Sequence, residues 1–153
     1  KMLKKIFLIV STIILITGCE YKPIYSESNK SDYKIIIKEL SGDKKINKFL
    51  VNNLERSSQK KSDKIVNLKI NTKYTKIILA KDAAGNVTNY QSNAITTFII
   101  DQNQTLKTFT INEKFNFQKM SDKYEEKGYE ENIKKNLATA IAQKLILRLS
   151  INQ

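Results

Sequence analysis

The stretches VTNYQSNAITTFII (residues 87–100) and TLKTFTINEKFNFQK (residues 105–119) alternate in side-chain character and lie four residues apart. One face of the first carries Tyr90, Ala94, Thr96, Phe98 and Ile100, and one face of the second carries Phe109, Ile111, Phe115 and Phe117. Such alternation indicates β-strands, and the polar loop Asp101–Gln104 indicates a hairpin between antiparallel neighbours. The aromatic stripe could line a lipid groove, but a sheet face buried in the core explains it better.

A third strand precedes this hairpin. Residues 64–74 alternate strictly, with Val66, Leu68, Ile70, Thr72 and Tyr74 on one face and Asn67, Lys69, Asn71 and Lys73 on the other. Such a strand has one buried face and one face in water. The apolar residues 77–80 follow, and DAAGN (residues 82–86) predicts a turn or loop before the hairpin begins.

Two further elements come before this strand. YKIIIKEL (residues 33–40) predicts a short strand, and because its middle is apolar on both faces we expect it in the centre of the sheet. SGD (residues 41–43) ends it, and Asp43 is placed to cap a helix over residues 44–57. The apolar residues of this helix recur at helical spacing, at Ile46, Phe49, Leu50 and Leu54.

The chain closes with an amphipathic helix over residues 130–149. Its apolar stripe comprises Ile133, Leu137, Ala140, Ile141, Leu145 and Arg148 or Leu149. Glu130 and Glu131 each stand four residues before a lysine, a spacing that favours ion pairs along a helix. The predicted order β-α-β-β-β-α indicates an α+β fold. Residues 33–153 would form one domain, with an antiparallel or mixed β-sheet of about four strands and two helices packed on one face.

The first eighteen residues, KMLKKIFLIVSTIILITG, have the pattern of an export signal. Three lysines accompany the apolar run Ile6–Ile16, which is shorter than the roughly 20 residues that a membrane-spanning helix needs. A charged start, a short apolar middle and small residues at the end are typical of a cleaved signal peptide, here residues 1–18. Met2 is the expected start of translation.

Cys19 is the only cysteine of the chain and follows this signal directly. A single thiol in an exported protein has no disulfide partner in its own chain and calls for another explanation. ITGC (residues 16–19) resembles the lipobox of bacterial lipoproteins, which implies that Cys19 carries a diacylglycerol and a further acyl chain such as palmitate. Two or more acyl chains anchor stably, so residues 19–32 would be a lipidated tether. The alternative is an ordinary signal followed by a chance cysteine.

Composition narrows the class of partner. Removal of the signal leaves 135 of 153 residues, enough for one domain, and lowers the formal net charge from +12 to +9. A strongly basic exported protein is suited to bind an anionic lipid or an acidic glycan. Its expected location outside the cytoplasm argues against nucleic acid as a partner. All but two of the 27 basic residues are lysine, however, and AT-rich codon usage would produce the same pattern. Both explanations of the charge stay open.

The residue types argue against an enzyme. Without histidine, and with one cysteine that is expected to be acylated, most metal sites and all histidine-based triads are excluded. The four glycines lie too far apart for a phosphate-binding loop. Glu125, Glu126, Glu130 and Glu131 could form the acid pair of a glycosidase, but solvated ion pairs with nearby lysines explain them better. We expect no catalytic residue, metal or cofactor.

The start of the mature chain, CEYKPIY (residues 19–25), resembles the CGYxPLY opening of the LptE family in its alphaproteobacterial form. Members of this family are lipoproteins of lipopolysaccharide assembly. DAAGNV (residues 82–87) ahead of a long hairpin and FNF (residues 115–117) at its end are similar to elements of the same family. Thr88 and Asn89 stand where an arginine is usual, which is a departure from the family pattern.

This resemblance implies an outer-membrane lipoprotein on the periplasmic side that plugs the barrel of its partner LptD, aids its assembly and helps deliver lipopolysaccharide to the outer leaflet. Lysines bind the phosphates of such a ligand through charge-assisted hydrogen bonds. The lysines that we expect to contact it are Lys69, Lys73, Lys76, Lys81 and Lys107. For any one of them, a solvated strand face is the alternative. For the whole chain, the alternative is a periplasmic lipoprotein that binds peptidoglycan or serves as an accessory subunit of a transporter.

The N-terminal pattern predicts that the mature chain begins at an acylated Cys19. Mass spectrometry of the protein extracted from membranes should find this residue at the N-terminus with acyl chains attached. Cys19→Ser should release the protein from membranes, because the thiol is the site of attachment. An N-terminus at another residue, without lipid, would contradict the prediction.

Overall fold

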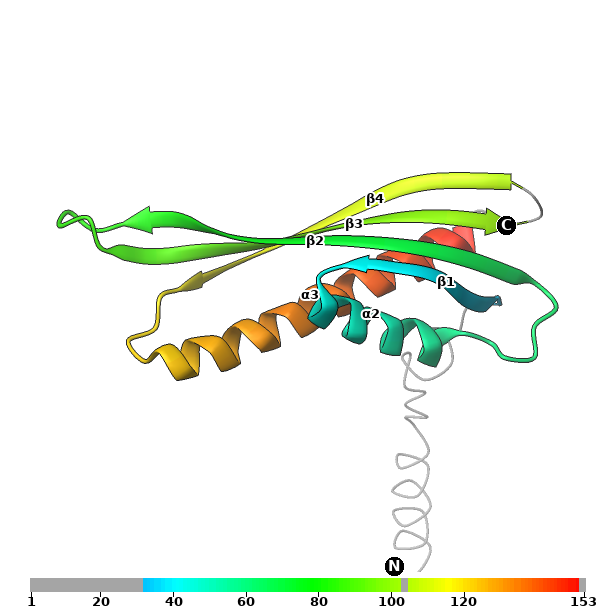
Figure 1. Ribbon diagram of the computed structural model, residues 1–153, viewed down its shortest axis with the longest axis horizontal. Coiled ribbons are helices and arrows are strands. Elements are labelled where there is room, and N and C mark those ends of the chain that lie inside the picture. The colour runs from blue at the N-terminus through cyan, green and yellow to red at the C-terminus, as the bar shows by residue number, and fades with distance from the viewer. Residues whose placement is uncertain (1–31, 103–104, 152–153) are drawn as a thin grey trace, which may run out of the picture.

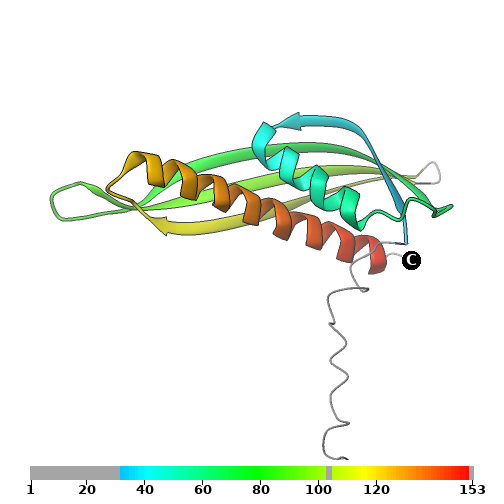
Figure 2. The ribbon, with the colours of Figure 1, turned by 90° about the horizontal axis from the view of Figure 1, so that it is seen from below.

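The computed structural model describes residues 32–102 and 105–151 and confirms the predicted α+β fold. The elements are β1 (Lys34–Gly42), α2 (Lys44–Ser57), β2 (Ile65–Lys81), β3 (Val87–Gln102), β4 (Thr105–Gln118) and α3 (Lys123–Ile151). The strands form one mixed sheet in the order β1-β2-β3-β4, with β1 parallel to β2 and the other neighbours antiparallel. Both helices lie on the same face of this sheet (Figure 1, Figure 2), and the other face, which no helix of the described residues covers, is called the helix-free face.

The core lies between the sheet and the two helices. The sheet contributes Val66, Leu68, Ile70, Phe98 and Ile100, and α2 contributes Ile46, Leu50 and Leu54, all buried. The buried stripe of α3 comprises Ile133, Leu137, Ala138, Ile141, Ala142, Leu145 and Leu149, so the predicted stripe is confirmed except at Ala140, which is half-buried. The aromatic stripe of β4 packs against this core, which confirms its interpretation as a core sheet face.

Strand β1 lies at the edge of the sheet, so the expectation of a central position is wrong. Its apolar run Ile35–Ile37 is half-buried. Three features protect this edge from pairing with another strand: flanking lysines, a break in register between Ile37 and Glu39, and a hydrogen bond of 2.9 Å from the Ile35 N–H to the Ser58 Oγ. A run that is apolar on both faces is thus compatible with an edge when the neighbouring elements shield it.

Gly42 determines where β1 ends. Its φ of +94° lies in the left-handed region, and a Cβ at this position would sit 1.9 Å from the carbonyl oxygen of Thr72. Asp43 donates its N–H to the same oxygen at 2.8 Å, and its carboxylate accepts from the Ile46 N–H at 2.9 Å. The predicted helix cap is therefore confirmed, and the chain leaves the sheet at the level of Thr72.

Strand β2 continues well beyond that level. The sequence predicts a strand to Tyr74, but residues 75–81 extend it as the partner of β3. Ile77, Ile78 and Leu79 in this extension are exposed by 49, 52 and 48 %. The predicted turn after it is closed by Asp82, whose carboxylate accepts from the N–H groups of residues 84 and 86 at 2.9 and 2.8 Å.

Two other boundaries differ from those predicted. Residues 101 and 102 belong to β3 rather than to a loop, since Gln102 pairs with Thr105. Helix α3 begins at Lys123 rather than at Glu130, because Asp122 caps it by accepting from the N–H groups of residues 124 and 125 at 2.6 and 2.9 Å. Acidic side chains in its first turn also suit the positive end of the helix dipole.

Ile141 is fully buried where α3 packs on the sheet, and its truncation tests this packing. Ile141→Ala should lower the free energy of unfolding by about 2–5 kcal/mol, because it removes buried apolar volume without adding charge. Leu147→Ala on the same helix is the matched control: Leu147 is 60 % exposed, and its truncation should change stability by less than about 0.5 kcal/mol. Equal denaturation midpoints for both variants would show that α3 does not pack as described.

Candidate functional site: lysines on the two faces of the sheet

Lys69 and Lys73 lie on the helix-free face of the sheet, as the alternation of β2 predicts. Lys69 is exposed and pairs with Glu39 of β1, with Nζ and Oε2 3.2 Å apart. Lys73 is exposed, and no ion-pair partner is found for it in the described part of the chain. The same face is polar across β3 and β4, where Thr97 shares a hydrogen bond of 3.1 Å with Thr110. This face therefore combines Lys69, Lys73 and the exposed Lys114 of β4 with hydroxyl and amide groups.

Lys76 points to the opposite face, toward α3. Its ammonium group donates to Glu126 Oε1 at 2.8 Å and to Glu130 Oε2 at 3.2 Å. The same group lies 4.3 Å from the ring centre of Tyr90 and 5.2 Å from that of Phe117. The side chain is 23 % exposed. Lys76 therefore ties β2 to α3 and offers little surface to a ligand.

A second lysine joins the same network from α3. Lys134 Nζ lies 2.9 Å from Asp43 Oδ2 and 3.9 Å from the ring centre of Tyr74. The Tyr74 hydroxyl donates to Glu130 Oε1 at 2.9 Å and shares a hydrogen bond of 2.7 Å with Ser92. Glu126 and Glu130 of α3 thus form ion pairs, as expected, but with β2 rather than along the helix, and no ion pair of Glu125 is found among the described residues. Glu131 likewise pairs with a lysine of α2, at 2.8 Å.

The pKa values in this network follow from its contacts. Burial acts to lower the pKa of Lys76, but the hydrogen bonds and charges of Glu126 and Glu130 outweigh burial and raise this pKa above its usual value. The hydrogen bond from Lys76 lowers the pKa of Glu126. Burial, and then Glu130, raise the pKa of Tyr74 well above its usual value. Lys76 and Glu126 therefore stay charged and Tyr74 stays neutral at neutral pH, so the network persists there.

Lys81 and Lys107 lie at opposite ends of the sheet. Lys81 pairs with Val87 beside the turn of the β2–β3 hairpin, and Lys107 pairs with Ile100 near the start of β4. Both lysines are exposed. The structure therefore does not bring the five predicted lysines together, because only Lys69 and Lys73 share a face and a strand.

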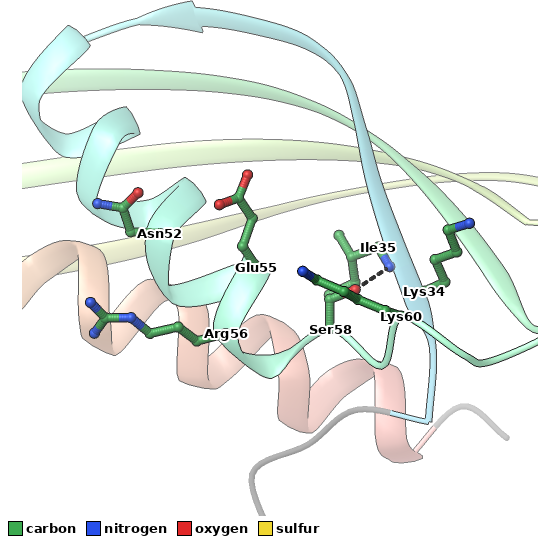
Figure 3. A pocket seen from close by; sticks show the side chains of 7 residues that line it. All are labelled: Lys34, Ile35, Asn52, Glu55, Arg56, Ser58 and Lys60. Atoms are coloured by element: carbon green, nitrogen blue, oxygen red, sulfur yellow. Dashed lines mark hydrogen bonds between the residues drawn. The ribbon is translucent and has the colours of Figure 1, made fainter.

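A positively charged hollow that the sequence did not reveal lies between β1 and the C-terminal end of α2 (Figure 3). Its volume is about 830 Å³, and it is lined by Lys34, Ile35, Asn52, Glu55, Arg56, Ser58 and Lys60. Three of these residues are cationic and one is acidic, so the hollow can accept an anionic group. The three cationic residues belong to a strand, the end of a helix and a loop. No periodic pattern in the sequence connects these three elements, so the hollow could not be predicted from it. The only signal was Arg56, one of two arginines in the chain.

Cys19 and the tether up to residue 31 lie outside the described residues, and their acylation stays a prediction. Among residues 32–102 and 105–151, no group of three or more His, Cys, Asp or Glu side chains is placed to hold a metal ion. The helices of this part of the chain are too short or too polar to cross a membrane.

Comparison with known proteins shows a shared fold. No protein-family model matches the sequence, and no curated protein matches it. Rare lipoprotein B from Shewanella oneidensis aligns over 78 % of this chain and 99 % of its own, with a TM-score of 0.55 and 13 % identity. A minor lipoprotein from Acinetobacter baumannii aligns over 75 % of this chain and 94 % of its own, with a TM-score of 0.51 and 17 % identity. The described domain therefore has the fold of these two bacterial lipoproteins.

Proposed function

We propose that this protein is an outer-membrane lipoprotein of the LptE type, which plugs the LptD barrel, aids its assembly and helps deliver lipopolysaccharide to the outer leaflet. The observation that carries the proposal is a lipobox-like sequence at residues 16–19 ahead of a domain with the fold of solved bacterial lipoproteins. The opening CEYKPIY (residues 19–25) adds the specific resemblance to LptE.

The helix-free face of the sheet suits contact with the inner wall of a barrel. The lumen of a large outer-membrane barrel is polar and favours surfaces of hydroxyl, amide and charged groups. This face presents such groups on three adjacent strands, including a hydrogen bond of 2.9 Å from Gln91 to Asn116. Ile99 on the same face is 36 % exposed and can add apolar contact. A polar barrel wall of matching shape would therefore bury this face at little cost in free energy.

Lys69 and Lys73 are the residues of this face best suited to phosphate groups. Lys73 needs no rearrangement to bind an anion. Lys69 must give up an exposed ion pair with Glu39, and such pairs contribute only about 0–1 kcal/mol. Lys76 is less suited than the sequence alone indicated, because its ammonium group is held by two carboxylates of α3.

The alternative is a periplasmic lipoprotein that binds peptidoglycan or serves as an accessory subunit of a transporter. The hollow beside Arg56 favours it, since three cations there could hold a carboxylate of a glycan or peptide. Both roles are non-enzymatic and involve no cofactor, and neither needs nucleic acid.

The partner is tested by affinity purification of the full acylated protein from outer membranes. We expect a large β-barrel protein to be recovered with it in a fixed ratio. The complex should withstand high salt, because a plug buries shape-matched surface as well as charges, and only the exposed charges are screened. Recovery of the protein with peptidoglycan and without any barrel would favour the alternative.

Lipopolysaccharide contact is tested by removing two charges from the helix-free face. Lys69→Gln combined with Lys73→Gln should weaken binding of purified lipopolysaccharide about tenfold, which corresponds to about 1.4 kcal/mol. Binding should also weaken as salt rises. Arg56→Gln combined with Lys60→Gln is the matched control, since it removes two charges at the hollow instead. If only the control pair loses binding while both keep their denaturation midpoints, lipopolysaccharide binds at the hollow and this assignment is wrong.

A further inference from the structure

Because β1 is shorter than β2, part of β2 lies at the edge of the sheet. β1 accompanies β2 only as far as Gly42, opposite Thr72, whereas β2 runs on to Lys81 (Figure 1). No described strand pairs with the outer side of β2 beyond the end of β1; the first turns of α3 overlap this part of β2 in Figure 2 and lie below the sheet in Figure 1. We call residues 73–81 of β2 the open edge.

The backbone of the open edge presents hydrogen-bonding groups to its outer side. The carbonyl groups of Ile70 and Thr72 accept from the Ser41 hydroxyl and the Asp43 N–H, so the even-numbered residues of β2 face the side of β1. By the alternation of a strand, Tyr74, Lys76 and Ile78 aim their N–H and C=O groups to the same side, while the odd-numbered residues bond to β3. No described residue hydrogen-bonds to these outward backbone groups.

The side chains of the open edge are aliphatic at its centre and basic at its ends. Ile78 lies on the helix side and Ile77 on the helix-free side, and Leu79 follows at the shift in register; each is about half exposed. Lys73 and Lys81 stand at the two ends, and within the described residues neither has an ion-pair partner. Residues 73–81 include no acidic side chain. Residues 73–78 keep an unbroken register with β3, and the register shifts only between Ile78 and Lys81. Unlike β1, this edge has no described side chain capping its N–H groups.

We propose that the open edge is a docking site for an extended, acidic strand of a partner polypeptide, which pairs with β2 in line with β1. An added strand would satisfy the outward N–H and C=O groups and cover the three aliphatic side chains. Acidic residues at its ends would lie beside Lys73 and Lys81. This site goes beyond the proposed function, because it depends neither on lipopolysaccharide nor on a barrel.

Two other occupants fit the open edge less well. A second copy of this chain, paired antiparallel about Ile77, would set Lys73 of each copy opposite Lys81 of the other, and like charges directly opposite one another destabilise a sheet. A lipid surface would cover the aliphatic side chains but leave the outward backbone groups without partners, which is strongly unfavourable in hydrocarbon. An acidic polypeptide strand avoids the repulsion between lysines and also provides hydrogen-bond partners for the outward backbone groups.

The test uses the full-length protein and the synthetic peptide Glu-Thr-Val-Val-Val-Thr-Thr-Thr-Glu as an antiparallel probe strand, whose glutamates are eight residues apart, as Lys73 and Lys81 are. Its valines match the aliphatic side chains on both faces, and its glutamates match the two lysines. In an NMR titration the amide signals of Tyr74, Lys76 and Ile78 should shift and their hydrogen exchange should slow. The same peptide with N-methylated backbone amides should not bind, because it cannot form the ladder of hydrogen bonds.

Two substitutions at one position separate backbone pairing from side-chain contact. Ile78→Pro removes an outward N–H and leaves the bonds to β3 in place, as proline is tolerated where the N–H faces outward. Ile78→Ala removes the same side chain but keeps the N–H. The proline variant should bind the peptide about tenfold more weakly than the alanine variant, equivalent to the loss of one or two hydrogen bonds.

A charge variant keeps the test decisive if Ile78→Pro lowers the denaturation midpoint. Lys73→Glu combined with Lys81→Glu should abolish binding of the acidic peptide and leave the fold intact, since both lysines are exposed. Equal binding of the N-methylated peptide, or of the charge variant, would overturn the proposal. The proposal would also be overturned if the same amide signals do not respond to the peptide but shift when phosphatidylglycerol vesicles are added or when the protein self-associates.

Discussion

The length of α3 relative to the strands limits how much of the sheet the helices cover. A helix of 29 residues spans about 43 Å, whereas a strand of 17 residues such as β2 spans about 56 Å. α2 adds cover only beneath the half of the sheet that also contains β1. The far end of the β2–β3 hairpin therefore has neither a second helix nor a fourth strand (Figure 1). The exposed aliphatic side chains result from this lack of helical cover, and the open edge results from the shortness of β1.

The inner face of the sheet changes character along β2 in step with this cover. Val66, Leu68 and Ile70 lie beneath two helices and are buried among aliphatic groups. From Thr72 onward the face carries hydroxyl groups and a charge, and the Thr72 hydroxyl shares a hydrogen bond of 3.1 Å with Thr96. Buried polar groups need partners, and the acidic first turns of α3 supply them to the ammonium group of Lys76. In this half of the sheet, ion pairs and hydrogen bonds hold the helix in place together with the contact between the rings of Phe117 and Tyr129.

Local patterns account for what could be predicted from the sequence. Alternation locates three of the four strands, helical spacing locates most of the α3 stripe, and the Asp43 cap follows from one short motif. The edge position of β1 could not be predicted, because three consecutive isoleucines are equally compatible with a central strand. Lys76 was assigned to a ligand because the strand was expected to end two residues earlier, so its face was unknown. The hollow beside Arg56 depends on residues from three separate elements, which only tertiary structure brings together.

The connections between strands have a consequence for the order of folding. β2, β3 and β4 are joined by short turns, whereas β1 reaches β2 only by way of α2, and α3 packs on α2, which lies far earlier in the chain. Contacts between nearby residues cost the least chain entropy, so we expect the three-stranded meander to form before β1 and α3 dock. In that order the whole length of β2 is at first an edge, and β1 later pairs with about half of it. The remaining half is a folding surface that none of the described residues closes.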